Sequence, residues 1–128
     1  MAWSDARRIL LCDDDQGALD CVGKLLDSAG YSVSTAHDYR EFMTRLTHDS
    51  PDLIILDVRM PERDGFWIAE ALQVRGMHTP VIFLTGCDSS IYKLYAPFVG
   101  SVAYLLKPVD SDLLLQKVKH ALGHPSVV

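Results

Sequence analysis

Short apolar segments alternate along the chain with longer segments in which apolar residues recur every three or four positions. The apolar segments span residues 9–12, 33–36, 53–56, 81–84 and 103–106, and the second of them is the weakest. Segments of this length that are apolar on both faces are typical of buried parallel strands. The pattern therefore predicts five strands, most of them covered on both sides.

The segments between these strands predict helices. Four of them carry apolar residues at helical spacing: Leu19, Val22, Leu26 and Ala29; Tyr39, Phe42, Met43 and Leu46; Phe66, Ala69 and Leu72; and Leu114, Val118, Ala121 and Leu122. Gly30 and Gly123 are typical helix stops, and Asp15 and Asp38 are the favoured N-caps of the first two helices. Residues 89–99 also have helical spacing, but Pro97 removes a backbone donor, so we predict a helix there that is kinked or ends early.

A strand followed by a helix, repeated five times, is typical of an α/β fold in which helices cover both faces of a parallel sheet. In such folds ligands bind at the carboxyl ends of the strands. Polar residues stand at four of these strand ends, and they are Asp13, Asp14, Asp57, Thr85 and Lys107. The fold is expected to bring them to one edge of the sheet.

The residue types at this edge suit phosphoryl transfer. Three carboxylates close together repel one another, and a hard divalent ion such as Mg²⁺ relieves that repulsion. A lysine and a hydroxyl can hold the oxygens of an anion, and a carboxylate can itself act as the nucleophile. On its own, each residue also has a plainer interpretation: Asp57 as a turn residue, Thr85 as a strand end, Lys107 as a surface cation and Tyr104 as a core aromatic.

Composition narrows the class of protein. The chain has 128 residues and a net charge of −5, which gives little support for direct binding to nucleic acid. Three cysteines at spacings that match no metal motif indicate reduced thiols. With neither a signal-peptide pattern nor an apolar run of membrane-spanning length, we expect a cytoplasmic protein without a membrane segment.

Four motifs in order give a more specific indication. They are Cys-Asp-Asp-Asp at residues 12–15, the segment from Asp57 to Asp64-Gly65, Thr85-Gly86, and Tyr-Leu-Leu-Lys-Pro at residues 104–108. Together they resemble the receiver domain of two-component response regulators, at a length close to the single-domain chemotaxis type. The resemblance implies a flavodoxin-like (βα)5 fold with strand order 2-1-3-4-5. It also implies a receiver domain over residues 8–122, between an N-terminal extension (1–7) and a C-terminal tail or linker (123–128).

The resemblance also implies a role for each site residue. Asp57 would be the phosphoacceptor, and Mg²⁺ or Mn²⁺ would be bound by Asp57, by Asp14 directly, by Asp13 through water and by the backbone carbonyl of Arg59.

On the same basis Lys107 would neutralise a phosphoryl oxygen, and Thr85 would donate its hydroxyl to another. Tyr104 would be the switch aromatic that moves inward when Thr85 is drawn to the phosphoryl group. The Lys107-Pro108 peptide bond would be cis.

A receiver would take its phosphoryl group from a histidine kinase or a His-containing phosphotransfer protein. It would then change the surface formed by the fourth helix, fifth strand and fifth helix, through which it could also dimerise. Such a domain catalyses its own phosphorylation and dephosphorylation but is best described as a signalling domain, and the sequence does not name its output. We also hypothesise that the side chain of Arg59 shields the acyl phosphate.

Two other functions stay open at this stage. An aspartyl-phosphate phosphohydrolase has a similar site but usually carries a second aspartate two residues after the nucleophile, where this chain has Arg59. A receiver-like interaction module that is never phosphorylated is the other alternative, and the complete set of acidic, hydroxyl and lysine residues argues against it.

Overall fold

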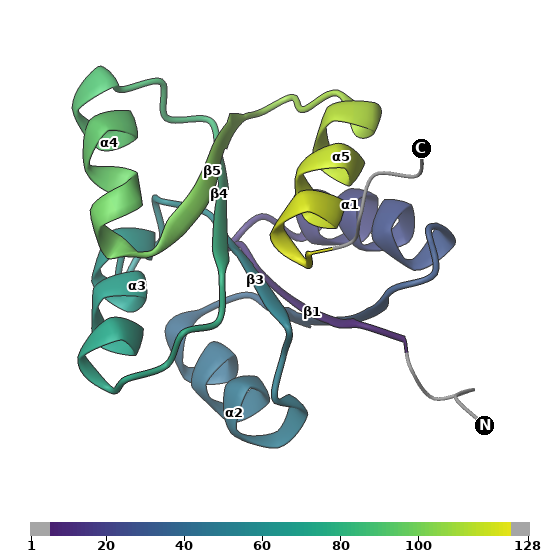
Figure 1. The fold of residues 1–128 in the computed structure, drawn as a ribbon, viewed down its shortest axis with the longest axis horizontal. Coiled ribbons are helices and arrows are strands. Elements are labelled where there is room, and N and C mark those ends of the chain that lie inside the picture. Colours follow the sequence, from purple (N-terminus) through teal and green to yellow (C-terminus); the bar gives the residue numbers. More distant parts are fainter. Residues whose placement is uncertain (1–5, 124–128) are drawn as a thin grey trace.

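The computed structural model describes residues 6–123, which form a five-stranded sheet and the helices that cover it (Figure 1). The elements are β1 (Arg8–Cys12), α1 (Gln16–Ser28), β2 (Ser32–Ala36), α2 (Tyr39–Asp49), β3 (Leu53–Leu56), α3 (Gly65–Val74), β4 (Val81–Thr85), α4 (Ser90–Tyr95), the 3₁₀ helix η1 (Ala96–Val99), β5 (Ser101–Leu106) and α5 (Ser111–Ala121). The predicted extension (1–7) and tail (123–128) lie mostly outside the described residues and stay predictions.

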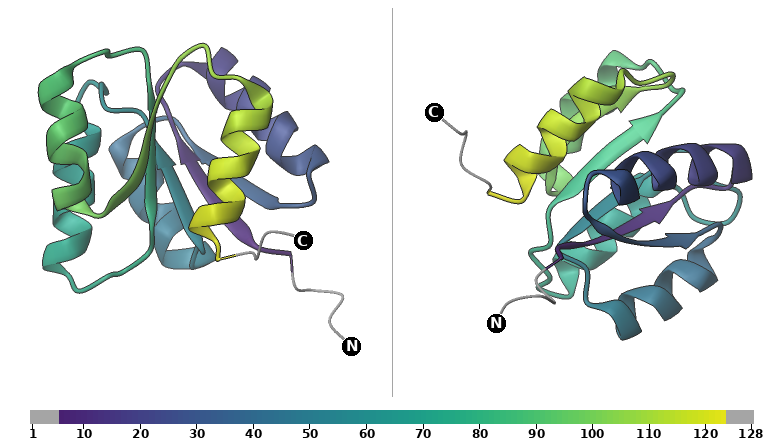
Figure 2. Two further views of the ribbon diagram at one scale, coloured as in Figure 1. Left: turned by 45° about the horizontal axis from the view of Figure 1, so that its top comes forward. Right: turned by 90° about the vertical axis from the view of Figure 1, so that its right-hand side faces the viewer.

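The sheet has the predicted topology. All four strand pairs are parallel and the order is β2-β1-β3-β4-β5. Helices α1 and α5 cover one face, and α2, α3 and α4 cover the other (Figures 1 and 2). The flavodoxin-like doubly wound fold is therefore confirmed.

Alternate residues of the central strands supply two separate cores. Leu10, Ile54 and Phe83 face α2 and α3, whereas Ile9, Ile55 and Ile82 face α1 and α5. All six side chains are at most 1% exposed, which explains why these strands read as continuous apolar runs. The resulting rigid sheet fixes where each strand ends, and so where the polar residues lie.

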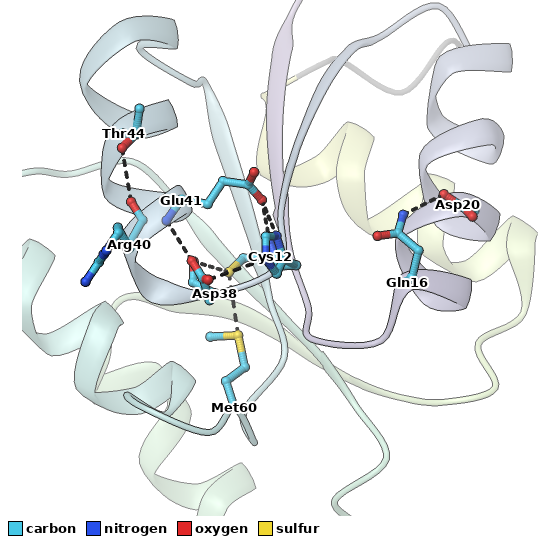
Figure 3. A network of polar contacts seen from close by, with 9 residues as sticks. Cys12, Gln16, Asp20, Asp38, Arg40, Glu41, Thr44 and Met60 are labelled. Carbon is cyan, nitrogen blue, oxygen red and sulfur yellow. Dashed lines mark hydrogen bonds and ion pairs between the residues drawn. The ribbon is translucent and has the colours of Figure 1, made fainter.

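Side-chain caps start the first two helices as predicted. Asp15 accepts a hydrogen bond from the backbone of Gly17, and Asp38 accepts one from Glu41. Figure 3 shows the contact between Asp38 and Glu41. The Glu41 carboxylate in turn accepts from the backbone of His37 at 2.8 Å, which closes the β2–α2 junction. Of the four apolar residues at helical spacing in the first helix, Ala29 is exposed, because α1 ends at Ser28 and Ala29 is its C-cap.

The fourth helix ends early, as Pro97 predicts. Regular α-helix stops at Tyr95, and Pro97 lies in the first turn of η1, where its missing N–H is tolerated. Gly100 then adopts a φ of 87°, a conformation that favours glycine, and the chain turns into β5. β5 begins at Ser101, two residues before the predicted start, and its register against β4 shifts between Val81 and Ile82.

Among the residues that the structure describes, no helix combines the length and the apolar character that a membrane span would require. The histidines His37, His48 and His78 are exposed.

Candidate functional site

The predicted site residues meet at the carboxyl edge of the sheet. The parallel hydrogen bonding continues one residue beyond the strands: the backbone N–H groups of Asp13, Asp57 and Lys107 donate to the carbonyls of Ala36, Cys12 and Thr85 at 3.0, 3.0 and 2.8 Å. Each of these residues is therefore held by its neighbouring strand rather than by a free loop. That arrangement limits how far their side chains can move apart.

Three carboxylates form the acidic part of the site. One oxygen of each of Asp13, Asp14 and Asp57 lies within 4.8 Å of the others. Asp13 and Asp57 are only 3% and 7% exposed, whereas Asp14 faces solvent. The site is thus a buried pair of acids with a third at its mouth.

Lys107 binds both buried acids. Its ammonium group donates to Oδ2 of Asp13 at 2.5 Å and to Oδ2 of Asp57 at 3.0 Å. The other oxygen of Asp13 accepts from the backbone of Asp15 at 2.9 Å, and that of Asp57 accepts from the backbone of Arg59 at 3.1 Å. Both carboxylates are fully engaged, which satisfies the requirement for burying charge.

The pKa values reflect this burial. Desolvation raises the pKa of Asp13, and the negative charge of Asp57 adds to the increase, while the hydrogen bond from Lys107 opposes it. For Lys107, burial alone would lower the pKa, but the hydrogen bonds to Asp13 and Asp57 outweigh it and the pKa is raised. Negative charge is therefore in excess here, and the site favours a cation.

The Thr85 hydroxyl lies at the end of β4 and is 1% exposed. Its oxygen accepts a hydrogen bond from the backbone of Cys87 at 3.2 Å. The hydroxyl hydrogen is then available for donation to an anion.

Tyr104 is tied to the same loop. Its hydroxyl donates to the carbonyl of Cys87 at 2.6 Å, and its ring centroid lies 6.0 Å from that of Phe83. Burial, and then the neighbouring Cys87, raise the pKa of Tyr104 to about 12. Cys87 thus contacts Thr85 through its N–H and Tyr104 through its carbonyl, a link that the sequence did not reveal because it runs through backbone atoms.

Arg59 lies two residues after Asp57 and is exposed. Its guanidinium interacts with the Cys87 side chain, which raises the pKa of Arg59 further above its usual value. The side chains of Arg59 and Cys87, from the loops after β3 and β4, therefore lie close to each other. The sequence gave no sign of this contact.

Gly65 begins α3 against the end of β3. Its N–H donates to the carbonyl of Val58 at 2.8 Å. A Cβ at this position would overlap the carbonyl oxygen of Asp57 and lie 3.1 Å from Cα of Val58. Glycine thus allows α3 to approach the backbone of Asp57 closely, a requirement that the sequence indicates only through the Asp64-Gly65 motif.

Comparison with known proteins gives consistent results. The family model of the response regulator receiver domain matches residues 9–119. The chain is 40% identical over 114 residues to the transcriptional regulatory protein GlrR of Escherichia coli, covering 89% of this chain and 26% of GlrR. It is 35% identical over 115 residues to the response regulator MprA of Mycobacterium tuberculosis, covering 90% of this chain and 50% of MprA. The chain therefore spans half or less of the length of these curated relatives.

Solved structures agree with the fold. A CheY-like receiver domain protein from Methanospirillum hungatei superposes with a TM-score of 0.85 at 30% identity, covering 93% of this chain and 95% of that chain. The chemotaxis protein CheY4 of Vibrio cholerae superposes with a TM-score of 0.84 at 31% identity, covering 91% and 98%.

Proposed function

The chain belongs to the response regulator receiver domain family of two-component systems, and from this premise we propose that Asp57 accepts a phosphoryl group from a phosphohistidine. The observation that carries the proposal is the position of Asp57, buried at the end of β3 between a lysine and two further acids. A carboxylate in this position can attack phosphorus without losing its hydrogen-bonded orientation. The donor would be a histidine kinase or a His-containing phosphotransfer protein.

Lys107 and Thr85 are proposed to hold the transferred group. Lys107 already donates to Asp57 at 3.0 Å. After transfer its ammonium group could therefore donate to an oxygen of the phosphoryl group on Asp57. Thr85 can donate its hydroxyl hydrogen to another oxygen while its own oxygen keeps the bond from Cys87. Tyr104, hydrogen-bonded to Cys87, is then the residue that would report the change to the surface of α4, β5 and α5.

The same residues suit a divalent cation. Hard carboxylate oxygens of Asp13, Asp14 and Asp57 lie within 4.8 Å of one another, which is the donor chemistry that Mg²⁺ or Mn²⁺ prefers. Asp14 is proposed as a direct ligand with Asp57, Asp13 as a ligand through water, and the backbone carbonyl of Arg59 as a further one. When bound, such an ion would neutralise charge on the phosphoryl oxygens.

Two alternatives are disfavoured by particular residues. A phosphohydrolase would need a general acid two residues after the nucleophile, and the side chain there is the cation Arg59, which cannot release a proton at neutral pH. An unphosphorylated interaction module would have no need to bury Asp13 and Asp57 against a lysine.

We further propose that a second copy of the chain binds at the α4–β5–α5 surface. Five large apolar side chains on α4, η1 and β5 are at least half exposed: Ile91 (64%), Leu94 (70%), Tyr95 (60%), Phe98 (75%) and Val102 (50%). We call these five residues the α4 patch. Since β5 is an edge strand and the patch itself carries no charge, the patch can pair with its own copy about a twofold axis. We place the reaction in the cytoplasm, where free thiols such as those of this chain stay reduced.

Intact mass spectrometry tests the acceptor. The protein is incubated with Mg²⁺ and phosphoramidate, and we expect it to gain the mass of one phosphoryl group. Asp57→Asn should remove the gain, whereas the matched control Asp27→Asn, at the far end of α1, should retain it. Steady release of phosphate from organic phosphates would instead support the phosphohydrolase, and absence of any adduct would support the unphosphorylated module.

A further inference from the structure

A hollow of about 450 Å³ opens beside the acceptor edge, between the loop that follows β3 and helix α4. Asp14 and Arg59 line it: Asp14 belongs to the carboxylate cluster, and the backbone N–H of Arg59 donates to Asp57 at 3.1 Å. The hollow therefore adjoins the proposed phosphorylation site.

Part of the lining of the hollow is apolar. Val58 and Met60 belong to the core, where they are 2% and 9% exposed, and they also line the hollow. Tyr92 lines it from α4, and its ring packs against Phe66 with centroids 5.1 Å apart. This packing restricts the rotation of the Tyr92 ring, so it can offer a fixed flat surface.

The remaining side is polar. The Asp14 carboxylate is exposed at the mouth, and the Arg59 guanidinium and the Asp64 carboxylate also line the hollow. Polar and apolar groups thus share the lining of the hollow in similar amounts. A mixed lining of this kind suits a small ring that has flat faces and polar nitrogens. An acetyl group has no such face and can gain little from Tyr92.

We propose that this hollow takes the imidazole ring of the phosphohistidine donor, with Tyr92 as a residue that sets donor specificity. The inference rests on the proposed function of Asp57 and names the part of the donor that the chain recognises. In the transfer a carboxylate oxygen of Asp57 forms the O–P bond while the P–N bond breaks. The electron pair of that bond stays on the ring nitrogen, and a ring protonated on its other nitrogen leaves as neutral imidazole.

Three small donors and two tyrosine variants test the proposal. The rate constants for modification of Asp57 by phosphoimidazole and by acetyl phosphate are measured with Mg²⁺ at low protein concentration, with phosphoramidate as a third, ring-free donor. Tyr92→Leu is expected to lower the ratio of the phosphoimidazole to the acetyl phosphate rate constant by about threefold to tenfold. Tyr92→Phe, which keeps the ring, should retain the wild-type ratio.

Tyr95→Leu is the matched control, since Tyr95 is on the same helix but is 60% exposed and does not line the hollow. It should keep the wild-type ratio. An unchanged ratio in Tyr92→Leu would overturn the inference and leave the proposed function standing. If no donor modifies Asp57, the proposed function itself fails.

A measurement on the wild-type protein avoids dependence on the folding of Tyr92→Leu. Titration with free imidazole, followed by methyl NMR, is expected to shift the signals of Val58 and Met60 more than those of Leu26 in the opposite core. Signals of Val58 and Met60 that do not move would contradict the inference.

Discussion

At the scale of single residues, Arg59 has the most direct kinetic consequence. Its side chain, two residues after Asp57 in the sequence, lies near that of Cys87 on the neighbouring loop. We hypothesise that these two side chains limit the access of water to an acyl phosphate on Asp57. The lifetime of the phosphorylated state should therefore depend on Arg59.

We predict that Arg59→Ala shortens the half-life of the phosphorylated protein several-fold, because the shield is removed without touching the acceptor. Loss of the phosphoryl mass after removal of the donor gives the half-life. Arg63→Ala is the control, since Arg63 lies 4.7 Å over the Trp67 ring, where its cation is held by stacking. Equal half-lives for wild type and Arg59→Ala would reject the shielding role.

At the scale of elements, the contact between α3 and the end of β3 leaves no room for a side chain at Gly65. We predict that Gly65→Ala destabilises the fold by about 1–3 kcal/mol, the usual cost of overpacking, and slows phosphorylation by displacing Asp57. Urea unfolding gives the stability and mass spectrometry gives the rate.

Gly23→Ala is the matched control for this substitution. A Cβ on Gly23 would meet nothing within 4 Å, and alanine is favoured in a helix interior by roughly 0.5–1 kcal/mol. It should leave stability equal or higher. A Gly65→Ala protein as stable and as reactive as wild type would show that α3 can shift without cost.

The β2–α2 junction is predicted to depend on pH. The Glu41 carboxylate lies 2.7 Å from Nδ1 of His37, which raises the pKa of His37, and the backbone N–H and the ring of His37 lower the pKa of Glu41. The stabilisation from His37 is complete below its ordinary pKa of 6.5 and is lost as pH rises through the raised value. The stabilisation from Glu41 is complete above its ordinary pKa of 4.5 and is lost as pH falls through the lowered value.

Glu41→Gln should therefore reduce stability most between the ordinary pKa values of these two groups, with a smaller difference on either side. Thermal unfolding across the pH range measures the difference from wild type. Glu70→Gln, an exposed position on α3, should give a difference that does not vary with pH. If the difference in stability between Glu41→Gln and wild type does not change with pH, the ion pair between His37 and Glu41 does not stabilise the junction.

The strands and helix starts were predictable because they depend on local patterns. Apolar runs identify the central strands, aspartates identify the caps, and Pro97 identifies the early end of α4. The start of β5 and the register shift between Val81 and Ile82 could not be predicted, because Ser101 and Val102 have no distinctive sequence pattern. That the site residues lie together at one edge of the sheet was predictable, because each of them follows a parallel strand. The hydrogen bond from Tyr104 to the carbonyl of Cys87 was not predictable, because it depends on how the loop after β4 packs against β5.

At the scale of the whole molecule, the α4 patch exposes large apolar side chains on α4, η1 and β5, and η1 contacts both of the other elements. We predict that the protein self-associates through it and that phosphorylation strengthens the association. Leu94→Glu should weaken association by more than about tenfold, because it introduces an unpaired charge at the centre of the interface. Sedimentation velocity over a range of concentrations measures this.

Val74→Glu is the control, since Val74 is 83% exposed on α3 and lies outside the patch. It should associate as wild type does. Association that survives Leu94→Glu, or a protein that stays monomeric at all concentrations with and without phosphorylation, would exclude the patch as the dimer interface.

The double contact of Lys107 with Asp13 and Asp57 makes the lysine a tethered counter-ion. A divalent ion at these oxygens would have to compete with an ammonium group that cannot diffuse away, and this competition would weaken the binding of the ion and speed its exchange. The domain would then pass readily between loaded and unloaded forms as the free ion concentration changes. Its readiness to react would thus be set by the surrounding solution as well as by its donor.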